Sequence, residues 1–295
     1  MAKTPKIQFD DSNDLIDICY DNVFKAVFTK NTPESKRALS CLISALIGRD
    51  VSVIMITANE PAIENLRDRQ LRFDIACLTE KEEPVNVEMS LNPTPVEPIR
   101  LEFHISKLFA GQDIRGTNKD YRDLKEAYQI AFLVSERFFP DEVFLHRFEY
   151  YDSERNISLG GKSRIITLEL SKLDRIIEKP VKEMTATEHW AVYFRYLRDM
   201  DKRRKINEIL QYEEGIAMAS EVLMTISRDQ VERARLMSEF KYEVDTRTHV
   251  NYAVDRAVNN AKIQFAKNLL EAGDSIEKII TATGLSREEI EGLRG

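Results

Sequence analysis

A predicted β-hairpin between residues 72 and 91, RFDIACLTEKEEPVNVEMSL, most narrows the folds that this chain can adopt. Side chains alternate between the two faces of a strand, so each arm of the hairpin has an apolar face and a more polar face. If the turn TEKEE is centred near Lys81, Asp74 on the first arm lies across from Glu88 on the second. The pattern therefore predicts a sheet whose polar face carries two opposed carboxylates.

Opposed carboxylates need a physical reason. They repel across neighbouring strands, and the repulsion grows where water is excluded. A divalent cation between Asp74 and Glu88 would make the interaction energy favourable, because both carboxylates would be attracted to the shared ion. Carboxylates, water and phosphate oxygens are the ligands that Mg²⁺ uses in phosphoryl chemistry. On a face open to water, the same two groups are ordinary solvated charges, with Arg72 and Arg100 as neutralising partners. The hairpin alone leaves both interpretations open.

Composition indicates an ordinary globular protein and excludes few functions. The 295 residues suffice for one large domain or two modest ones, with 43% hydrophobic and 32% charged residues. No segment approaches the roughly 20 apolar residues of a membrane span, and the N-terminus lacks the apolar core of a signal peptide. We therefore expect a cytoplasmic protein without membrane contact. A net charge of −7 argues against coating nucleic acid through global charge, although it permits a local basic cleft.

The hydrophobic periodicity predicts an α/β region followed by helices. Helices are expected over residues 14–29, with Asn13 as N-cap, over 33–48 and over 99–114; strands are expected over 51–57, in the hairpin, over 127–135 and in two later alternating segments, VFLHRFEYYDSE and SRIITLELSKL. From about Pro180 the strand signal disappears. We therefore predict a first domain over 1–178 and a helical C-terminal region over 179–295. That region ends in a helix-turn-helix-like hairpin around Gly284.

Isolated cysteines and scattered histidines give no metal-binding spacing. Cys19, Cys41 and Cys77 form no CxxC pair, and no histidine lies near them at ligand spacing. The cysteines are expected to be small buried or half-buried side chains. A zinc site is therefore disfavoured.

The segments around the hairpin resemble the PD-(D/E)XK nuclease family transposases, or recombination-promoting nucleases. In that family an R-x-D strand leads through a hairpin to an E-M-Q strand, then to a helix R-x-x-Y-Y-x-S-K-L-Y and a G…Y-x-x-L loop. The matching residues here are Arg72, Asp74, Glu88, Met89, Arg100, Ser106, Lys107, Leu108, Gly116, Tyr121 and Leu124. DNVFKAVF, TLELSKL and the C-terminal LLEAGDSIEKIITATGLSREEIEGL are also similar. The order and spacing of these pieces carry the resemblance, which covers most of the chain.

The resemblance implies a restriction-endonuclease-like fold, in which a mixed sheet is flanked by helices and followed by an all-helical C-terminal region. It also implies a DNA endonuclease that depends on Mg²⁺ (or Mn²⁺). Asp74 and Glu88 would hold the metal, with Asp21 as an extra ligand. The metal would polarise the scissile phosphate and lower the pKa of an attacking water.

One departure from the family bears on catalysis. The active-site position two residues after the glutamate is normally Gln, or Lys in the wider superfamily, whereas this chain has Ser90. We expect Lys107 to supply the missing cation, with Lys25 as a further candidate. Arg72, Arg100 and Lys107 are candidates for contact with DNA phosphates. For Arg100 and Lys107 the alternative is a solvated helix face or an ion pair with Glu88 or Glu102. The alternative is a catalytically degenerate nuclease fold that binds DNA or a protein partner without cutting.

The C-terminal hairpin lacks the charge of a DNA-reading helix. Its second helix carries Arg287 and Arg294 against Glu288, Glu289 and Glu291. A packing or oligomerising role is therefore favoured over base contact. A homo-oligomer formed through the C-terminal helices stays open.

Overall fold

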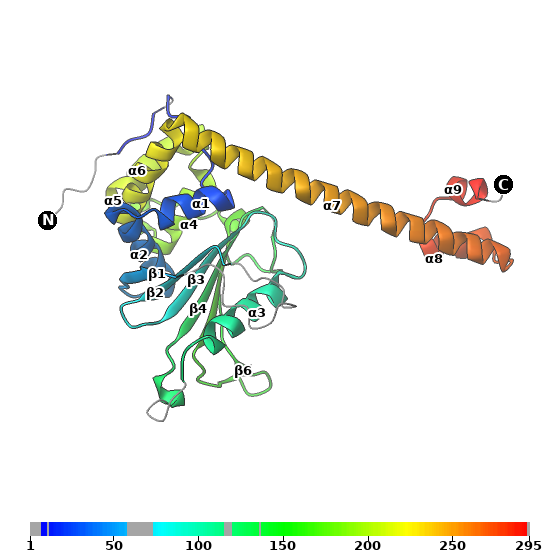
Figure 1. Cartoon of the computed structure of the whole chain (residues 1–295), viewed down its shortest axis with the longest axis horizontal. Helices are drawn as coiled ribbons and strands as arrows, with labels where there is room; N and C mark the ends of the chain where they lie inside the picture. The colour runs from blue at the N-terminus through cyan, green and yellow to red at the C-terminus, as the bar shows by residue number, and fades with distance from the viewer. Residues whose placement is uncertain (1–6, 11, 58–72, 115–119, 136, 294–295) are drawn as a thin grey trace. The chain divides into compact units, whose positions relative to one another are not determined.

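The computed structural model describes residues 7–10, 12–57, 73–114, 120–135 and 137–293 (Figure 1). Internal contacts divide the chain into two compact units, Met1–Leu236 and Met237–Gly295. The first unit contains the sheet and the helices that cover it. The second contains most of one long helix and a short helical hairpin.

A mixed sheet of six strands forms the centre of the first unit. Its order is β1 (Val53–Ile56), β2 (Ile75–Thr79), β3 (Pro84–Ser90), β4 (Ala127–Leu133), β8 (Ser163–Glu169) and β5 (Leu145–Phe148). The pairs β1–β2, β2–β3 and β8–β5 are antiparallel, whereas β3–β4 and β4–β8 are parallel. A separate two-stranded ribbon joins β6 (Tyr151–Asp152) to β7 (Ile157–Ser158). Because β3 and β4 are buried on both faces, the sheet needs helices on both sides.

Helices cover the two faces unequally (Figure 1). The helix α3 (Glu97–Ala110) packs on one face against β3, β4 and β8. The opposite face forms the main core with α1 (Asp21–Thr29), α2 (Pro33–Ile47), α4 (Ala186–Tyr196), α5 (Arg203–Tyr212) and α6 (Glu214–Arg228). Phe132 of β4 shows this packing, since its ring lies 6.2 Å from Phe24 and 4.8 Å from Phe194, centroid to centroid. The predicted mixed sheet flanked by helices is confirmed.

The hairpin has the register that its sequence predicts. Ile75 pairs with Val87 and Cys77 with Val85, so the turn is centred at residue 81. The turn is closed by Thr79, whose hydroxyl donates to the Glu83 carboxylate at 2.8 Å. Extending this register by one residue brings Asp74 opposite Glu88.

The first predicted helix is shorter than expected. It begins at Asp21 rather than near residue 14, because the segment before it forms an Asp-centred turn in which the Asp17 carboxylate accepts a hydrogen bond from Cys19 N at 2.9 Å. Ile16 N donates to Ser227 Oγ at 3.2 Å instead of to a helical carbonyl. Leu15 is buried all the same. Its apolar spacing therefore reflects contact with the core and not helical structure.

The change from strands to helices near residue 178 does not coincide with the division of the structure into units. The helices α4, α5 and α6 belong to the sheet unit, where α6 packs closely on α2. Gly215 makes this approach possible, since a Cβ there would lie 2.3 Å from Cys41 Cβ. The division by contacts falls between Leu236 and Met237.

The second unit consists of helices alone. The helix α7 (Gln230–Glu271) begins in the first unit and continues through the second, and α8 (Ile276–Thr283) and α9 (Arg287–Gly292) follow it. Gly284 ends α8 in the left-handed region with φ 69°, which produces the predicted hairpin turn. None of the helices that the structure describes combines the length and apolar composition required to cross a bilayer.

Candidate active site

The two carboxylates of the hairpin lie at the end of β3 that faces α1 and α3. Asp74 directly precedes β2, and its Oδ2 accepts a hydrogen bond from Met89 N at 3.0 Å. This bond holds the Asp74 carboxylate against β3, beside Glu88. The Glu88 side chain is only 1% exposed. The site is thus built on the sheet itself and shielded from bulk water.

The helix α1 brings a lysine and a third carboxylate to Asp74. Lys25 Nζ lies 3.1 Å from Asp74 Oδ1 and 2.8 Å from Asp21 Oδ2. Asp21 and Lys25 are one helical turn apart, so both face the sheet together. Burial opposes the charge on Lys25, but the Asp74 and Asp21 carboxylates outweigh it and raise the pKa of the lysine. Lys25 is therefore a permanent cation at this site.

The helix α3 supplies the partners of Glu88. His104 Nδ1 lies 2.5 Å from Glu88 Oε1, and Arg100 Nη2 lies 3.0 Å from Oε2. Asn86, on the same face of β3, donates its amide to Oε1 at 2.9 Å. Burial alone would raise the pKa of Glu88; the His104 hydrogen bond and the Arg100 charge outweigh burial, and its pKa is lowered. Glu88 is therefore an ionised carboxylate in a nearly dry environment.

Asp74 has the opposite electrostatic behaviour. Its burial, together with the negative charges of Asp21 and Glu88, raises its pKa to about 7, although Lys25 and the hydrogen bond from Met89 N act in the other direction. In the metal-free protein, Asp74 therefore holds a proton far more readily than an ordinary aspartate. The proton on Asp74 and the separate cationic partners of the two carboxylates thus reduce the repulsion between Asp74 and Glu88.

Asp21, Asp74 and Glu88 offer donors for a divalent cation, although in the described part of the chain their ligand atoms do not all lie within 4.8 Å of one another. Asp21, Asp74 and Glu88 offer hard oxygen ligands from three elements, which is the donor chemistry that Mg²⁺ and Mn²⁺ prefer. Asp21 Oδ1 is a buried oxygen that accepts no hydrogen bond within the described part of the chain, whereas Glu88 Oε2 lies 3.0 Å from Arg100 Nη2. A buried oxygen without a donor is costly, and a bound cation would relieve that cost at Asp21 Oδ1.

A comparison with protein families shows to which family this chain is related. The profile of the PD-(D/E)XK nuclease family transposases matches residues 18–253, well over half of the chain. This protein belongs to that family. Searches of curated proteins and of solved structures gave no match. Membership supports a nuclease-type function, and PD-(D/E)XK nucleases generally depend on a divalent metal.

Not every residue that the family resemblance selected reaches the carboxylates. Lys107 forms no ion pair with Asp74 or Glu88 among the residues described, and its Nζ lies 5.7 Å from the centroid of the Phe103 ring. Lys107 is seven residues beyond Arg100, which places it about 10 Å farther along α3. The cation beside Asp74 is instead Lys25, from a different helix.

The other site residues predicted from the sequence are Ser90, Arg72 and Arg100. Ser90 ends β3, where its carbonyl accepts a hydrogen bond from Val134 N at 3.0 Å. Arg72 lies outside the described residues. Arg100 contacts Glu88 and Glu97. His104 was not selected from the sequence. Its place one helical turn after Arg100 was the available signal, since side chains four residues apart share a helix face.

A second polar cluster in this family member has a structural explanation. Asp141, His146 and Glu169 each offer a ligand atom, and these atoms lie within 4.8 Å of one another. However, Lys172 Nζ already lies 2.5 Å from Glu169 Oε2 and 3.2 Å from Asp141 Oδ1. The lysine supplies the positive charge that a metal would bring. This cluster is therefore explained as a buried ion-pair network.

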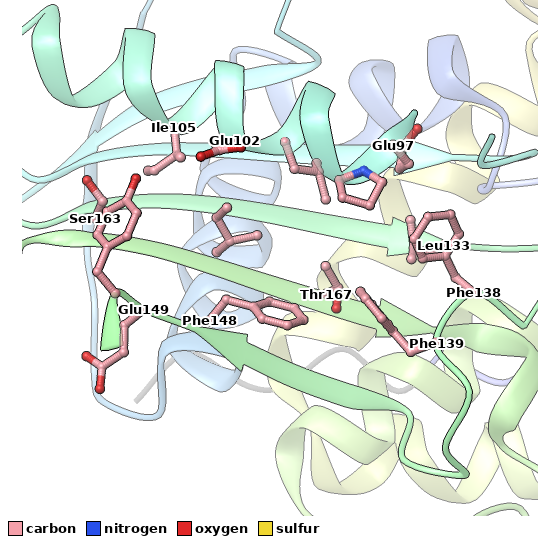
Figure 2. Close-up of a pocket in the computed structure, with 14 residues that line it drawn as sticks. Glu97, Glu102, Ile105, Leu133, Phe138, Phe139, Phe148, Glu149, Ser163 and Thr167 are labelled. Carbon is pink, nitrogen blue, oxygen red and sulfur yellow. The ribbon is translucent and has the colours of Figure 1, made fainter. Parts of the chain in front are cut away.

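A pocket of about 230 Å³ lies between α3 and the strands β4, β5 and β8 (Figure 2). It is lined mainly by Leu101, Ile105, Leu133, Phe138, Phe139 and Phe148. Such apolar walls offer nothing to a phosphate. Thr167 is exceptional in this pocket, because its Oγ1 is buried and has no hydrogen-bond partner in the structure as described.

Replacing Thr167 by Val should stabilise the protein by about 1 kcal/mol, because the change removes an unsatisfied buried hydroxyl and keeps the shape of the side chain. The free energy of unfolding in urea measures the effect. Thr187→Val is the matched control. The Thr187 hydroxyl donates to Ala45 O at 2.6 Å, so its loss should destabilise the protein by a similar amount. Equal effects of the two changes would contradict this account of Thr167.

Proposed function

We propose that this protein is a DNA endonuclease of the transposase or recombination-promoting type, which hydrolyses phosphodiester bonds with Mg²⁺ (or Mn²⁺). Asp74 and Glu88 are the principal metal ligands, and Asp21 is a third. The observation that carries the proposal is the convergence of three carboxylates and one lysine from α1, the start of β2 and β3. The family match supports it.

Each residue has a role that follows from its chemistry. A divalent cation, when bound, supplies a Lewis acid for the phosphate and a water of lowered pKa. Lys25 stabilises the negative charge that develops on the phosphate, because it is a fixed cation beside Asp74. It thereby fills the role left open by Ser90. Arg100 and His104 position the Glu88 carboxylate and keep it ionised.

Cleavage of supercoiled plasmid DNA tests the proposal. The wild-type protein should nick plasmid with Mg²⁺ or Mn²⁺ and not with EDTA. Asp74→Asn and Glu88→Gln should each lower the rate by about two orders of magnitude or more, a size typical for the loss of a group that stabilises the transition state. Asp141→Asn, which changes a carboxylate of the other cluster, should cleave normally. Nicking that survives both hairpin substitutions would remove these residues from the mechanism.

Ser90 favours a second candidate, a nuclease fold that binds DNA or a protein without cutting. A serine hydroxyl is short and neutral, and cannot replace the Gln or Lys of related enzymes. Ser90→Gln and Ser90→Lys separate the candidates. A large gain in cutting over an almost inactive wild type would favour the degenerate fold, whereas little change would show that Lys25 already meets the requirement.

Metal binding should depend on pH through Asp74. A metal ligand must be ionised, and the pKa of this carboxyl is about 7 in the metal-free protein. Below that pH, affinity for Mn²⁺ should fall about tenfold per unit, because each ion displaces one proton. The raised pKa also means that the metal-free protein loses stability as pH rises from about 4 to 7, since only the unfolded chain gives up the proton there.

Isothermal titration calorimetry between pH 5.5 and 8 measures this dependence. Repeating the titrations in buffers of different ionisation enthalpy counts the protons released. Above pH 7 the affinity should level off. An affinity that stays constant from pH 6 to 8 would show that Asp74 is not a ligand.

A further inference from the structure

The helix α7 carries apolar residues at intervals of seven. Met237, Val244, Val258 and Phe265 follow this spacing, and their side chains are 40%, 43%, 50% and 49% exposed. In the sequence, Asn251 is the remaining member of the series. Strict seven-residue spacing is the pattern of a coiled-coil seam, in which one helix packs along another.

A second series accompanies the first, three residues farther along. Its members are Phe240, Arg247, Val254 and Ala261, of which Val254 is 54% exposed. The two series together give the alternating three- and four-residue steps of an a/d pattern over about four heptads. We call the side chains Met237, Val244, Val254, Val258 and Phe265 the α7 stripe.

The C-terminal hairpin does not cover the α7 stripe. The α8–α9 hairpin packs on Ile263, Ala266, Leu269 and Leu270 of α7. At 100° per residue, these positions lie between about 40° and 160° around the helix from Phe265. The hairpin thus covers a neighbouring face.

Along the middle of α7 the described side chains have little cover. From Met237 to Lys262 all of them are exposed except that of Phe240, which is half-buried. Most of the stability of a helix in a protein comes from packing of an apolar face. Exposed apolar residues that share one face of a helix also mark interaction surfaces.

We propose that the α7 stripe is the interface of a homodimer, in which α7 of one copy packs along α7 of a second copy. A heptad seam is complementary to another heptad seam, and a second copy of this chain provides one. Valine at the positions of the first series suits two-stranded packing. The seam extends over about 42 Å of helix, at 1.5 Å per residue. This inference does not depend on the proposed nuclease activity.

Sedimentation equilibrium of the full chain tests the dimer. At about 50 µM the wild type should show twice the chain mass of 34.2 kDa. The double variant Val244→Lys/Val258→Lys should raise the dimer dissociation constant by at least 100-fold and show the single-chain mass. Lysine has a higher helix propensity than valine, so loss of the dimer cannot be attributed to weaker helix formation.

The matched control is Tyr242→Lys/Tyr252→Lys. These tyrosines are 75% and 68% exposed, and each precedes a stripe residue by two positions, about 200° around the helix. The control should remain dimeric with the wild-type dissociation constant. A monomeric wild type at 50 µM would overturn the proposal. So would a valine double variant that dimerises as tightly as the wild type, or equal weakening by both double variants.

Discussion

Replacing Lys25 by Met should lower the rate of DNA cleavage by about two to three orders of magnitude. Removal of one preorganised group that stabilises developing charge has an effect of this size. The Lys25 ammonium lies 3.1 Å from Asp74 Oδ1 and 2.8 Å from Asp21 Oδ2. Met keeps the length and apolar character of the stem, so its packing against the sheet is retained.

The matched control for this change is Lys107→Met. Lys107 is the lysine that the family resemblance selected, yet it lies over Phe103 and away from the carboxylates. Its replacement should change cleavage by no more than a few-fold. Single-turnover rates at saturating Mn²⁺ separate an effect on chemistry from an effect on metal affinity. A Lys25→Met rate equal to the wild-type rate, or a large loss in Lys107→Met, would reverse the two assignments.

The position of Lys25 shows why sequence reasoning placed Lys107 first and Lys25 only second as the cation of the site. The pairing of Asp74 with Glu88 depends only on strand alternation and on a short turn, both of which are local. The approach of Lys25 to Asp74 depends on how α1 packs on the sheet, about 50 residues away along the chain. Ser90 indicated that a cation was missing from its usual place. The packing of α1 brings Lys25, the second candidate from the sequence, to within 3.1 Å of Asp74.

The fold likewise has parts that the sequence predicts and parts that depend on packing between distant segments. Alternation in β2 and β3 and the long apolar segment of β4 predicted the centre of the sheet. Neighbouring residues of a strand point to opposite faces, so a short segment already shows which faces are buried. The segment around Leu15 was expected to be helical from its apolar spacing, although an Asp17 turn interrupts it. Periodicity reports which side chains are buried. It does not report whether the backbone between them is helical.

The two acidic clusters illustrate how similar residues serve different purposes. Beside the hairpin, the buried Asp21 Oδ1 accepts no hydrogen bond among the described residues, and burial together with Asp21 and Glu88 raises the pKa of Asp74 to about 7. At Glu169, by contrast, both carboxylate oxygens have partners. One oxygen contacts Lys172, and the other accepts a hydrogen bond from Phe139 N at 3.2 Å. A satisfied buried charge contributes to structure, whereas an unsatisfied one needs a ligand.

Lys172→Met should therefore destabilise the protein by about 3–5 kcal/mol, the penalty for leaving one buried charge without its partner. The Lys172 and Glu169 side chains are fully buried and 2.5 Å apart, and Lys172 Nζ also donates to Phe139 O at 2.9 Å. The free energy of unfolding in guanidinium chloride, measured on the metal-free protein, gives the loss directly.

The double variant Lys172→Met/Glu169→Gln provides the control. Gln removes the unpaired charge, and its carbonyl oxygen can still accept the hydrogen bonds from Phe138 N and Phe139 N. The double variant should therefore recover most of the stability that Lys172→Met loses. If the single change costs less than about 1 kcal/mol, or if the double variant is no more stable than the single one, the pair is not a buried structural ion pair. The cluster of Asp141, His146 and Glu169 would then have to be reconsidered as a metal site.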